Sequence, residues 1–514
     1  MLFNSYAFLL VYLPITVIGF FIVARRNQTL AALWLGIASV AFYGWWDYHY
    51  IPLLLGSVVF NFWCGRRICE CAMPQRKQWL VFAVVVDLVL LAYYKYADFF
   101  LTSASQIFGA KLIPLGVILP IGISFFTFTQ IAFLVDSYQG KVKEYRFVHY
   151  LLFVTYFPHL IAGPVLHHKE MMPQFADPRS YRLHGANFAI GLSIFCIGLA
   201  KKVLLADSLA PYANALFSAP DSPSLLVAWG GVLAYSFQLY FDFSGYSDMA
   251  IGLSRLFGVQ LPLNFNSPYK ATNISDFWRR WHMTLSRFLR EYLYIALGGN
   301  RRGRVRRYAN LIMTMLLGGL WHGAGWNFVI WGGLHGIYLV IHNAWSTLTK
   351  RLGAPVESLA WKSLAVLGTF VAVCFAWVFF RAPDLPVSLM IIKGMTGSFG
   401  VGLPEAIGNQ LGGLRPALEG IGMTFFLGGG TQFLETWTWV AAAALIAFTC
   451  PNTQEILGSF TPALEFHSAH LPKGWLAETL RWTPTRSWAI ALGTLLVLSL
   501  LSLNRPSQFL YFQF

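Results

Sequence analysis

A histidine within an apolar run is the residue of this chain best placed to do chemistry. His322 lies in LLGGLWHGAGWNF, residues 316–328, between Trp321 and Gly323. An ionisable side chain in such a run is costly and is normally kept for a function. Burial disfavours the charged form of imidazole, so the neutral ring could accept a proton as a general base, an effect worth about 10²–10⁴-fold in rate. The alternative is a packing histidine that is hydrogen-bonded to a neighbouring helix.

A second histidine lies in an arginine-rich stretch. FWRRWHMTLSRFLREYLYIALGGNRRGRVRR, residues 277–307, contains nine arginines, no lysine and one acid, Glu291. Planar guanidinium groups bind phosphate oxygens in pairs, which indicates a phosphate-bearing ligand. The alternative is a basic loop on the cytoplasmic side of a membrane. Spacings of three and four predict that one helical face carries Arg279, His282, Ser286 and Arg290.

Other candidate residues favour packing or ion coupling. On a continuous helix, His335 lies about 220° around the axis from His322, so we expect it to pack elsewhere. Asp242 and Asp248 lie in an apolar segment, where they either form an ion-coupling site or pair with internal groups. We expect no metal, because no HExxH motif is present and the histidines lack cysteine or acidic partners at ligand spacing.

Composition shows what kind of protein must position these residues. Hydrophobic residues make up 56% of the 514 and charged residues 11%, far from the roughly 25% charged residues of a soluble domain. This predicts an all-α polytopic membrane protein with about 11–13 crossings of about 20 residues each. The net charge of +15 then indicates basic cytoplasmic loops in place of nucleic-acid binding. The six cysteines show no CxxC pair and are interpreted as small apolar residues.

The apolar runs predict the order of the helices. The first, from about 6 to 23, ends at Arg25 and Arg26, so we expect a retained helix with the N-terminus outside. Pro158, Gly163 and Pro164 predict a broken, re-entrant segment. We treat residues 1–514 as a single domain. We expect further apolar helices at 30–46, 80–94, 113–135 (bent), 188–203, 225–256, 364–380, 437–448 and 488–503. A glycine-rich loop is expected at 381–432.

Several ordered motifs resemble the membrane-bound O-acyltransferase family, and in particular its bacterial branch acting on alginate and teichoic acid. The resemblance covers most of the chain, is densest at 110–345 and includes the near-terminal NRPSQFLYFQF. The helices expected at about 360–514 are peripheral to this core region. The motifs are PIGISFFTFTQ (120–130), YFPHLIAGPVLHHKEMMPQF (156–175), YFDFSGYSDMAIGLSRLFG (240–258), NFNSPYKATNISDFWRRWHMTLSRFLREYLYIALGGNR (264–301) and LWHGAGWNFVIWGGLHG (320–336).

The resemblance implies a fold and a reaction. The family fold is a ring of helices around a central tunnel, with His322 as the catalytic histidine and His282 as the second polar residue. The implied donor is an acyl thioester such as acetyl-CoA, with no bound cofactor. The expected donor-binding residues are Arg279, Arg280, Trp281 and Arg287 of the arginine-rich stretch, together with Trp321 beside His322.

In this branch the acyl group crosses the bacterial inner membrane for O-acetylation of an extracellular polysaccharide such as alginate. Periplasmic acetyltransferases are the expected protein partners. Two other functions remain open from the residues alone. The first is an ion-coupled exporter of polymer or lipid that uses Asp242 and Asp248. The second is a non-enzymatic membrane scaffold for periplasmic enzymes.

Overall fold

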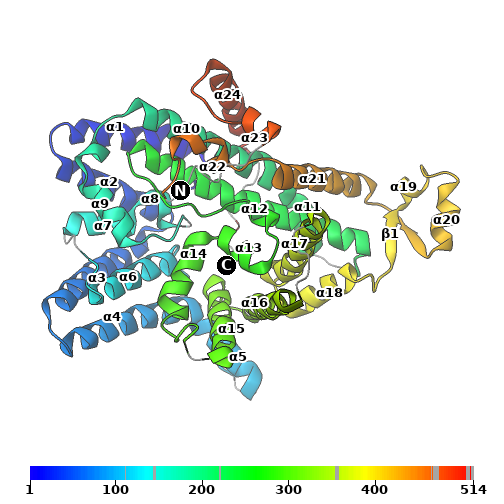
Figure 1. The fold of residues 1–514 in the computed structure, drawn as a ribbon, viewed down its shortest axis with the longest axis horizontal. Coiled ribbons are helices and arrows are strands. Elements are labelled where there is room, and N and C mark those ends of the chain that lie inside the picture. Colours follow the sequence, from blue (N-terminus) through cyan, green and yellow to red (C-terminus); the bar gives the residue numbers. More distant parts are fainter. Residues whose placement is uncertain are drawn as a thin grey trace.

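Helices form almost the whole of the computed structural model (Figure 1). It describes residues 1–109, 111–142, 146–161, 163–218, 221–301, 303–352, 358–464, 466, 474–504 and 510. The prediction of an all-α polytopic membrane protein is confirmed. Of the near-terminal NRPSQFLYFQF, only Asn504 and Leu510 belong to the described residues.

The α-helices run from one end of the chain to the other. They are α1 (Leu13–Ala24), α2 (Gln28–Gly44), α3 (Ile51–Glu70), α4 (Gln75–Leu91), α5 (Ala97–Phe108), α6 (Ile123–Tyr138), α7 (Phe147–Thr155), α8 (Phe157–Leu160), α9 (His168–Ala176), α10 (Gly185–Ala200), α11 (Asp207–Ser218), α12 (Leu225–Leu256), α13 (Ile274–Arg280), α14 (Met283–Phe288), α15 (Gly303–His322), α16 (Trp326–Leu352), α17 (Leu359–Arg381), α18 (Leu385–Met395), α19 (Glu405–Gly408), α20 (Leu414–Gly420), α21 (Gly430–Thr449), α22 (Thr453–Ile456), α23 (Trp475–Thr479) and α24 (Arg486–Leu501).

Several of these helices are joined by π-helical turns, which insert one extra residue into a turn and often occur at functional sites. The π-helical turns are η1 (Ala7–Tyr12), η3 (Ala92–Tyr96), η5 (Lys201–Ala206) and η7 (Leu289–Tyr294). Two short strands, β1 (Val401–Pro404) and β2 (Met423–Phe426), form a parallel pair that projects with α19 and α20 from the right-hand end in Figure 1.

Four helical stretches of the described chain are long and apolar enough to cross a membrane. They are Ala7–Ala24, Gln75–Phe108, Gly185–Ser218 and Leu359–Arg381, and three shorter apolar helices are Gln28–Gly44, Leu385–Met395 and Arg486–Leu501. At 1.5 Å per residue, the buried helix α12 is about 48 Å long, which exceeds the roughly 30 Å apolar thickness of a bilayer.

Some predicted boundaries were right and others were wrong. Helix α12 begins and ends at the predicted residues, and the segment around Pro158 is broken into α7, α8 and α9, as predicted. The predicted bent helix over 113–135 was wrong at its start, because Gly116 and Gly122 adopt left-handed conformations and α6 begins only at Ile123. The predicted glycine-rich loop over 381–432 contains α18, β1, α19, α20 and β2.

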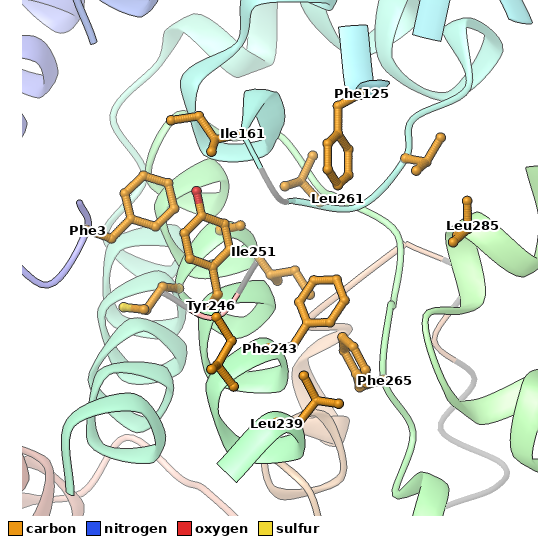
Figure 2. Packing of buried hydrophobic residues seen from close by; sticks show 14 of the residues in the cluster. Phe3, Phe125, Ile161, Leu239, Phe243, Tyr246, Ile251, Leu261, Phe265 and Leu285 are labelled. Carbon is orange, nitrogen blue, oxygen red and sulfur yellow. The ribbon is translucent and has the colours of Figure 1, made fainter. Parts of the chain in front are cut away.

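The core centres on α12, whose side chains are buried on nearly all sides. Figure 2 shows Phe243, Tyr246 and Ile251 of this helix among side chains from distant parts of the chain. The ring of Phe3 stacks on Tyr246 with 4.7 Å between centroids. Because α12 packs against α10, α11 and α21, it is the element that fixes where the surrounding helices lie.

Two pairs of glycines let α10 and α12 approach closely. A Cβ placed on Gly252 would lie 2.5 Å from the carbonyl oxygen of Gly191, and one on Gly245 would lie 2.7 Å from that of Gly198. Gly191 and Gly198 are seven residues apart on α10, and Gly245 and Gly252 are seven residues apart on α12. They therefore meet in antiparallel order. Small residues at such positions are how helices pack in lipid, where the hydrophobic effect between them is absent.

We expect Gly252→Ala to lower the free energy of unfolding by about 1–3 kcal/mol, because the added methyl group would force α10 and α12 apart. Gly493→Ala in α24 is the matched control, since a Cβ there has nothing within 4 Å. Thermal unfolding of the purified protein in detergent compares the two variants. Equal unfolding midpoints would contradict close packing at this crossing.

Candidate active site

The two candidate histidines lie together although forty residues separate them in sequence. The ring centroids of His282 and His322 are 6.4 Å apart. His322 is the last residue of α15. The centroid of its ring lies 5.1 Å from that of Trp331 and 5.2 Å from that of Phe380. The ring of His282 lies beside those of Phe243 and Phe265, with 4.8 and 6.3 Å between centroids, so both imidazoles have aromatic neighbours.

His282 lies at a break between two short helices. Helix α13 ends at Arg280, α14 begins at Met283, and His282 has φ 43°, a left-handed conformation that is strained for a residue other than glycine. The extended segment 262–267 takes up the freed main-chain groups. Asn266 N–H donates to the carbonyl of Arg280, and Met283 N–H donates to the carbonyl of Asn264. This exchange of hydrogen bonds stabilises the break.

The side chain of Asn264 fixes the protonation of His282. Its Oδ1 accepts from the Thr284 backbone N–H at 3.3 Å and from Thr284 Oγ1 at 2.9 Å, so this atom is the amide oxygen. The same oxygen lies 3.1 Å from His282 Nδ1, which must therefore carry a proton and donate. In a neutral ring, Nε2 is then an acceptor, and it has no hydrogen-bond partner among the described residues.

The prediction of one helical face for Arg279, His282, Ser286 and Arg290 was wrong. The break at His282 turns its ring into the core, where it is fully buried. The other three residues do line a common cavity of about 250 Å³. The full lining is Pro262, Leu263, Trp278, Arg279, Met283, Thr284, Ser286, Arg287 and Arg290.

The predicted donor-binding residues divide into separate places. Arg279 and Arg287 line the arginine cavity, whereas Arg280 forms an ion pair with Asp276 at 2.9 Å. Trp281 is buried beside Trp377, with 5.0 Å between ring centroids, and does not line that cavity. Arg287 is itself paired with Glu170 at 2.7 Å, a partner from outside the arginine-rich stretch.

A second cavity, of about 150 Å³, reaches His322. Trp321, the last of the predicted donor-binding residues, lines this cavity and stacks on Phe128 at 5.5 Å. The remaining lining is Trp46, Lys95, Leu119, Pro120, Ile121, Gly122, Ile123, Ser124, Phe125 and Ile161. The arginine cavity borders Thr284, which is linked through Asn264 to His282, and the second cavity borders His322.

The geometric argument that separated His335 from His322 was wrong. Helix α15 ends at His322 and α16 begins at Trp326, so the chain turns between them and no continuous helix joins the two histidines. His335 is nevertheless in a packing position, as expected. Trp278 Nε1–H donates to its Nδ1 at 3.3 Å, and Trp331 contacts the rings of both histidines.

The two aspartates of α12 pair with internal groups, the second of the alternatives that the sequence left open. Asp242 lies 2.6 Å from Lys202 Nζ, and Asp248 lies 2.7 Å from Lys201 Nζ. Thr453 and Gln454 also donate to Asp248. The partners are lysines of η5 and not an arginine.

Three residues near the histidines were missed by the sequence reasoning: Lys95, Ser124 and Asn264. Lys95 carried a usable signal, since it is a charged residue directly after a predicted apolar crossing. Asn264 lies in a motif that was quoted only for its resemblance. Its contact with His282 depends on the extended segment crossing the α13–α14 break, which no local pattern indicates.

Comparison with known proteins shows which family this sequence matches. The family model for the membrane-bound O-acyltransferase family matches residues 51–382. The chain is 47% identical to the peptidoglycan O-acetyltransferase of Helicobacter pylori, over 78% of this chain and 81% of that protein. It is 39% identical to the probable alginate O-acetylase of Pseudomonas aeruginosa over the full length of both. Identity to the teichoic acid D-alanyltransferase of Streptococcus thermophilus is 29%, over 51% of this chain and 68% of that protein.

The family model spans more than half of the chain, and one relative matches it from end to end. This chain is a membrane-embedded acyltransferase and belongs to the membrane-bound O-acyltransferase family.

Proposed function

We propose that the protein transfers an acetyl group from a cytoplasmic thioester, acetyl-CoA, across the bacterial inner membrane for O-acetylation of an extracytoplasmic polysaccharide. The observation that carries the proposal is the pair His282 and His322, with 6.4 Å between their ring centroids. Asn264 and Thr284 link His282 to the arginine-lined cavity, and His322 lines the second cavity together with Lys95. The names of two relatives, one acting on peptidoglycan and one on alginate, supply the acceptor class.

The charges support the direction of transfer. Arg279, Arg287 and Arg290 belong to the most basic stretch of the chain, and basic loops lie on the cytoplasmic side. The phosphates of coenzyme A would bind there through charge-assisted hydrogen bonds. The second cavity borders Trp46, whose aromatic neighbours at 43–50 suit the opposite interface. The N-terminus would then be periplasmic, and the acceptor or a periplasmic acetyltransferase would approach at Trp46.

The chemistry follows from the two imidazoles. A ring nitrogen of His322 takes the proton of the acceptor hydroxyl while its oxygen attacks the thioester carbonyl carbon. The carbon–sulfur bond then breaks, and the thiolate that leaves takes the proton from His322. His282 Nε2 is an acceptor, so it orients an N–H or O–H group in the site and does not polarise the carbonyl, which would need a donor.

We expect His322→Ala to lower acetyl transfer by about 10²–10⁴-fold, because the general base is lost. The purified protein is given acetyl-CoA labelled in the acetyl group, with de-acetylated alginate or peptidoglycan and with or without a periplasmic extract, and the label is followed. His342→Ala, in the C-terminal half of α16, is the matched control for histidine removal.

Full transfer by a folded His322→Ala variant would contradict the proposal. Loss of function in Asp242→Asn without any use of the thioester would instead favour the exporter. Unchanged polymer acetylation in cells carrying either variant would favour the scaffold.

We expect Asn264→Ala to lower kcat by about tenfold or more with little change in the KM for acetyl-CoA, because His282 would lose the acceptor that fixes its proton and its orientation. Ser247→Ala is the control, because it removes a different hydrogen bond of Asn264. Ser247 Oγ accepts from Asn264 Nδ2 at 3.2 Å. Steady-state kinetics gives the kcat and the KM for acetyl-CoA of both variants. A wild-type kcat in Asn264→Ala would remove His282 from the reaction.

We expect the double variant Arg279→Ala/Arg290→Ala to raise the KM for acetyl-CoA about fivefold or more at low salt, and less at high salt, because two exposed cations of the arginine cavity are lost. Arg304→Ala is the control, an exposed arginine that does not line this cavity. Arg287 is left intact, since its removal would leave the buried Glu170 without its cation. Equal KM values for the double variant and the control would place the donor elsewhere.

A further inference from the structure

A half-buried lysine holds the end of the helix that carries His322. Lys95 lies on the π-helical turn η3, within the continuous helical stretch Gln75–Phe108. Its Nζ donates to the carbonyl oxygen of Trp321, to that of His322 at 3.3 Å, and to Ser124 Oγ at 3.3 Å. An ammonium group has three N–H donors, so these three oxygens use all of them.

The neighbouring residue of the same turn adds a third helix-end contact. Tyr96 O–H donates to the carbonyl oxygen of Leu320 at 2.9 Å. The last four carbonyl groups of a helix have no partner within that helix. Side chains of η3 thus satisfy three consecutive carbonyls at the end of α15, those of Leu320, Trp321 and His322.

The charge of Lys95 is balanced by this helix end. In the described part of the chain, no carboxylate lies within ion-pair distance of its Nζ. The C-terminus of α15 carries a partial negative charge on its free carbonyls, which stabilises a cation there. Lys201 and Lys202 beside α12 contrast with this, since both pair with aspartates. The end of α15 therefore stabilises the ammonium charge of Lys95, and Lys95 in turn satisfies two carbonyl groups at that helix end.

Lys95 also borders the space where the reaction would take place. Together with Ser124 and Trp321 it lines the cavity that reaches His322. A shift of the helix end would move the imidazole directly, because His322 is the last residue of α15 and the chain turns at Gly323. Misplacement of a reacting group by about 1 Å can reduce a rate by about 10²-fold.

We propose that Lys95 is a positioning residue of the acyl transfer: its ammonium group terminates α15 and holds His322 at the cavity. This inference rests on the proposed function of His322. It assigns the π-helical turn η3 a task, which is to direct two consecutive side chains, Lys95 and Tyr96, onto one helix end.

The test compares kinetics with folding. We expect Lys95→Met to lower kcat about tenfold or more while the KM for acetyl-CoA stays within about twofold, because the donor phosphates bind in the other cavity. Lys95→Arg should recover part of kcat, since it retains a cation with several donors. Tyr96→Phe is the matched control, because it removes one hydrogen bond to the same helix end and no charge. Its loss of kcat should be smaller than that of Lys95→Met.

Thermal unfolding in detergent is measured on the same preparations. A wild-type kcat per folded molecule in Lys95→Met, with only the unfolding midpoint lowered, would show a merely structural role and overturn the proposal. If Lys95→Met does not accumulate in the membrane, Lys95→Gln replaces it, because the amide keeps an N–H donor without the charge. A wild-type kcat in Lys95→Gln would overturn the proposal equally.

His322→Ala, assayed alongside, separates the two inferences. An inactive His322→Ala with a fully active Lys95→Met would refute the role of Lys95 alone. Full activity in a folded His322→Ala variant would refute the proposed function itself and the role of Lys95 with it.

Discussion

The centre of the protein depends on one amide side chain and the extended segment that carries it. Asn264 accepts through its main-chain carbonyl from Met283 N–H, and through Oδ1 from Thr284 and His282. These contacts occur where two helices break, deep in an apolar interior in which unpaired polar groups are costly. The segment 262–267 supplies the missing partners, so the break becomes stable. The break in turn gives His282 a backbone conformation that no continuous helix would allow.

Close helix packing and irregular backbone are complementary parts of this fold. Glycine pairs bring α10 and α12 together and make α12 a rigid wall of the core. The non-helical residues 119–122 and the segment 262–267 each border one of the two cavities. Non-helical backbone is tolerated at membrane depth only where other protein groups or a cavity satisfy it. The regular helices thus create the environment in which an irregular active site can exist.

What could be predicted from the sequence depended on how local the determining contacts are. The ends of α12 follow from a long apolar run, and the break near Pro158 follows from proline. Periodicity failed at His282, because the hydrogen bonds that interrupt the helix come from a segment about eighteen residues earlier. It failed again after His322, where a short glycine-containing turn separates two antiparallel helices. The juxtaposition of the two histidines was only a hypothesis until the fold gave their separation.

The distribution of buried charge distinguishes the structural part of the interior from the reactive part. Near α10 and α12, Asp242, Asp248 and Asp207 each lie against a lysine of η5, so every one of these carboxylates has a cation as its partner. Near the histidines the pattern changes: Lys95 faces carbonyl oxygens in place of a carboxylate. A cation balanced by a helix end stabilises the local structure and leaves the imidazole neutral, which is the form that acyl transfer from a thioester requires.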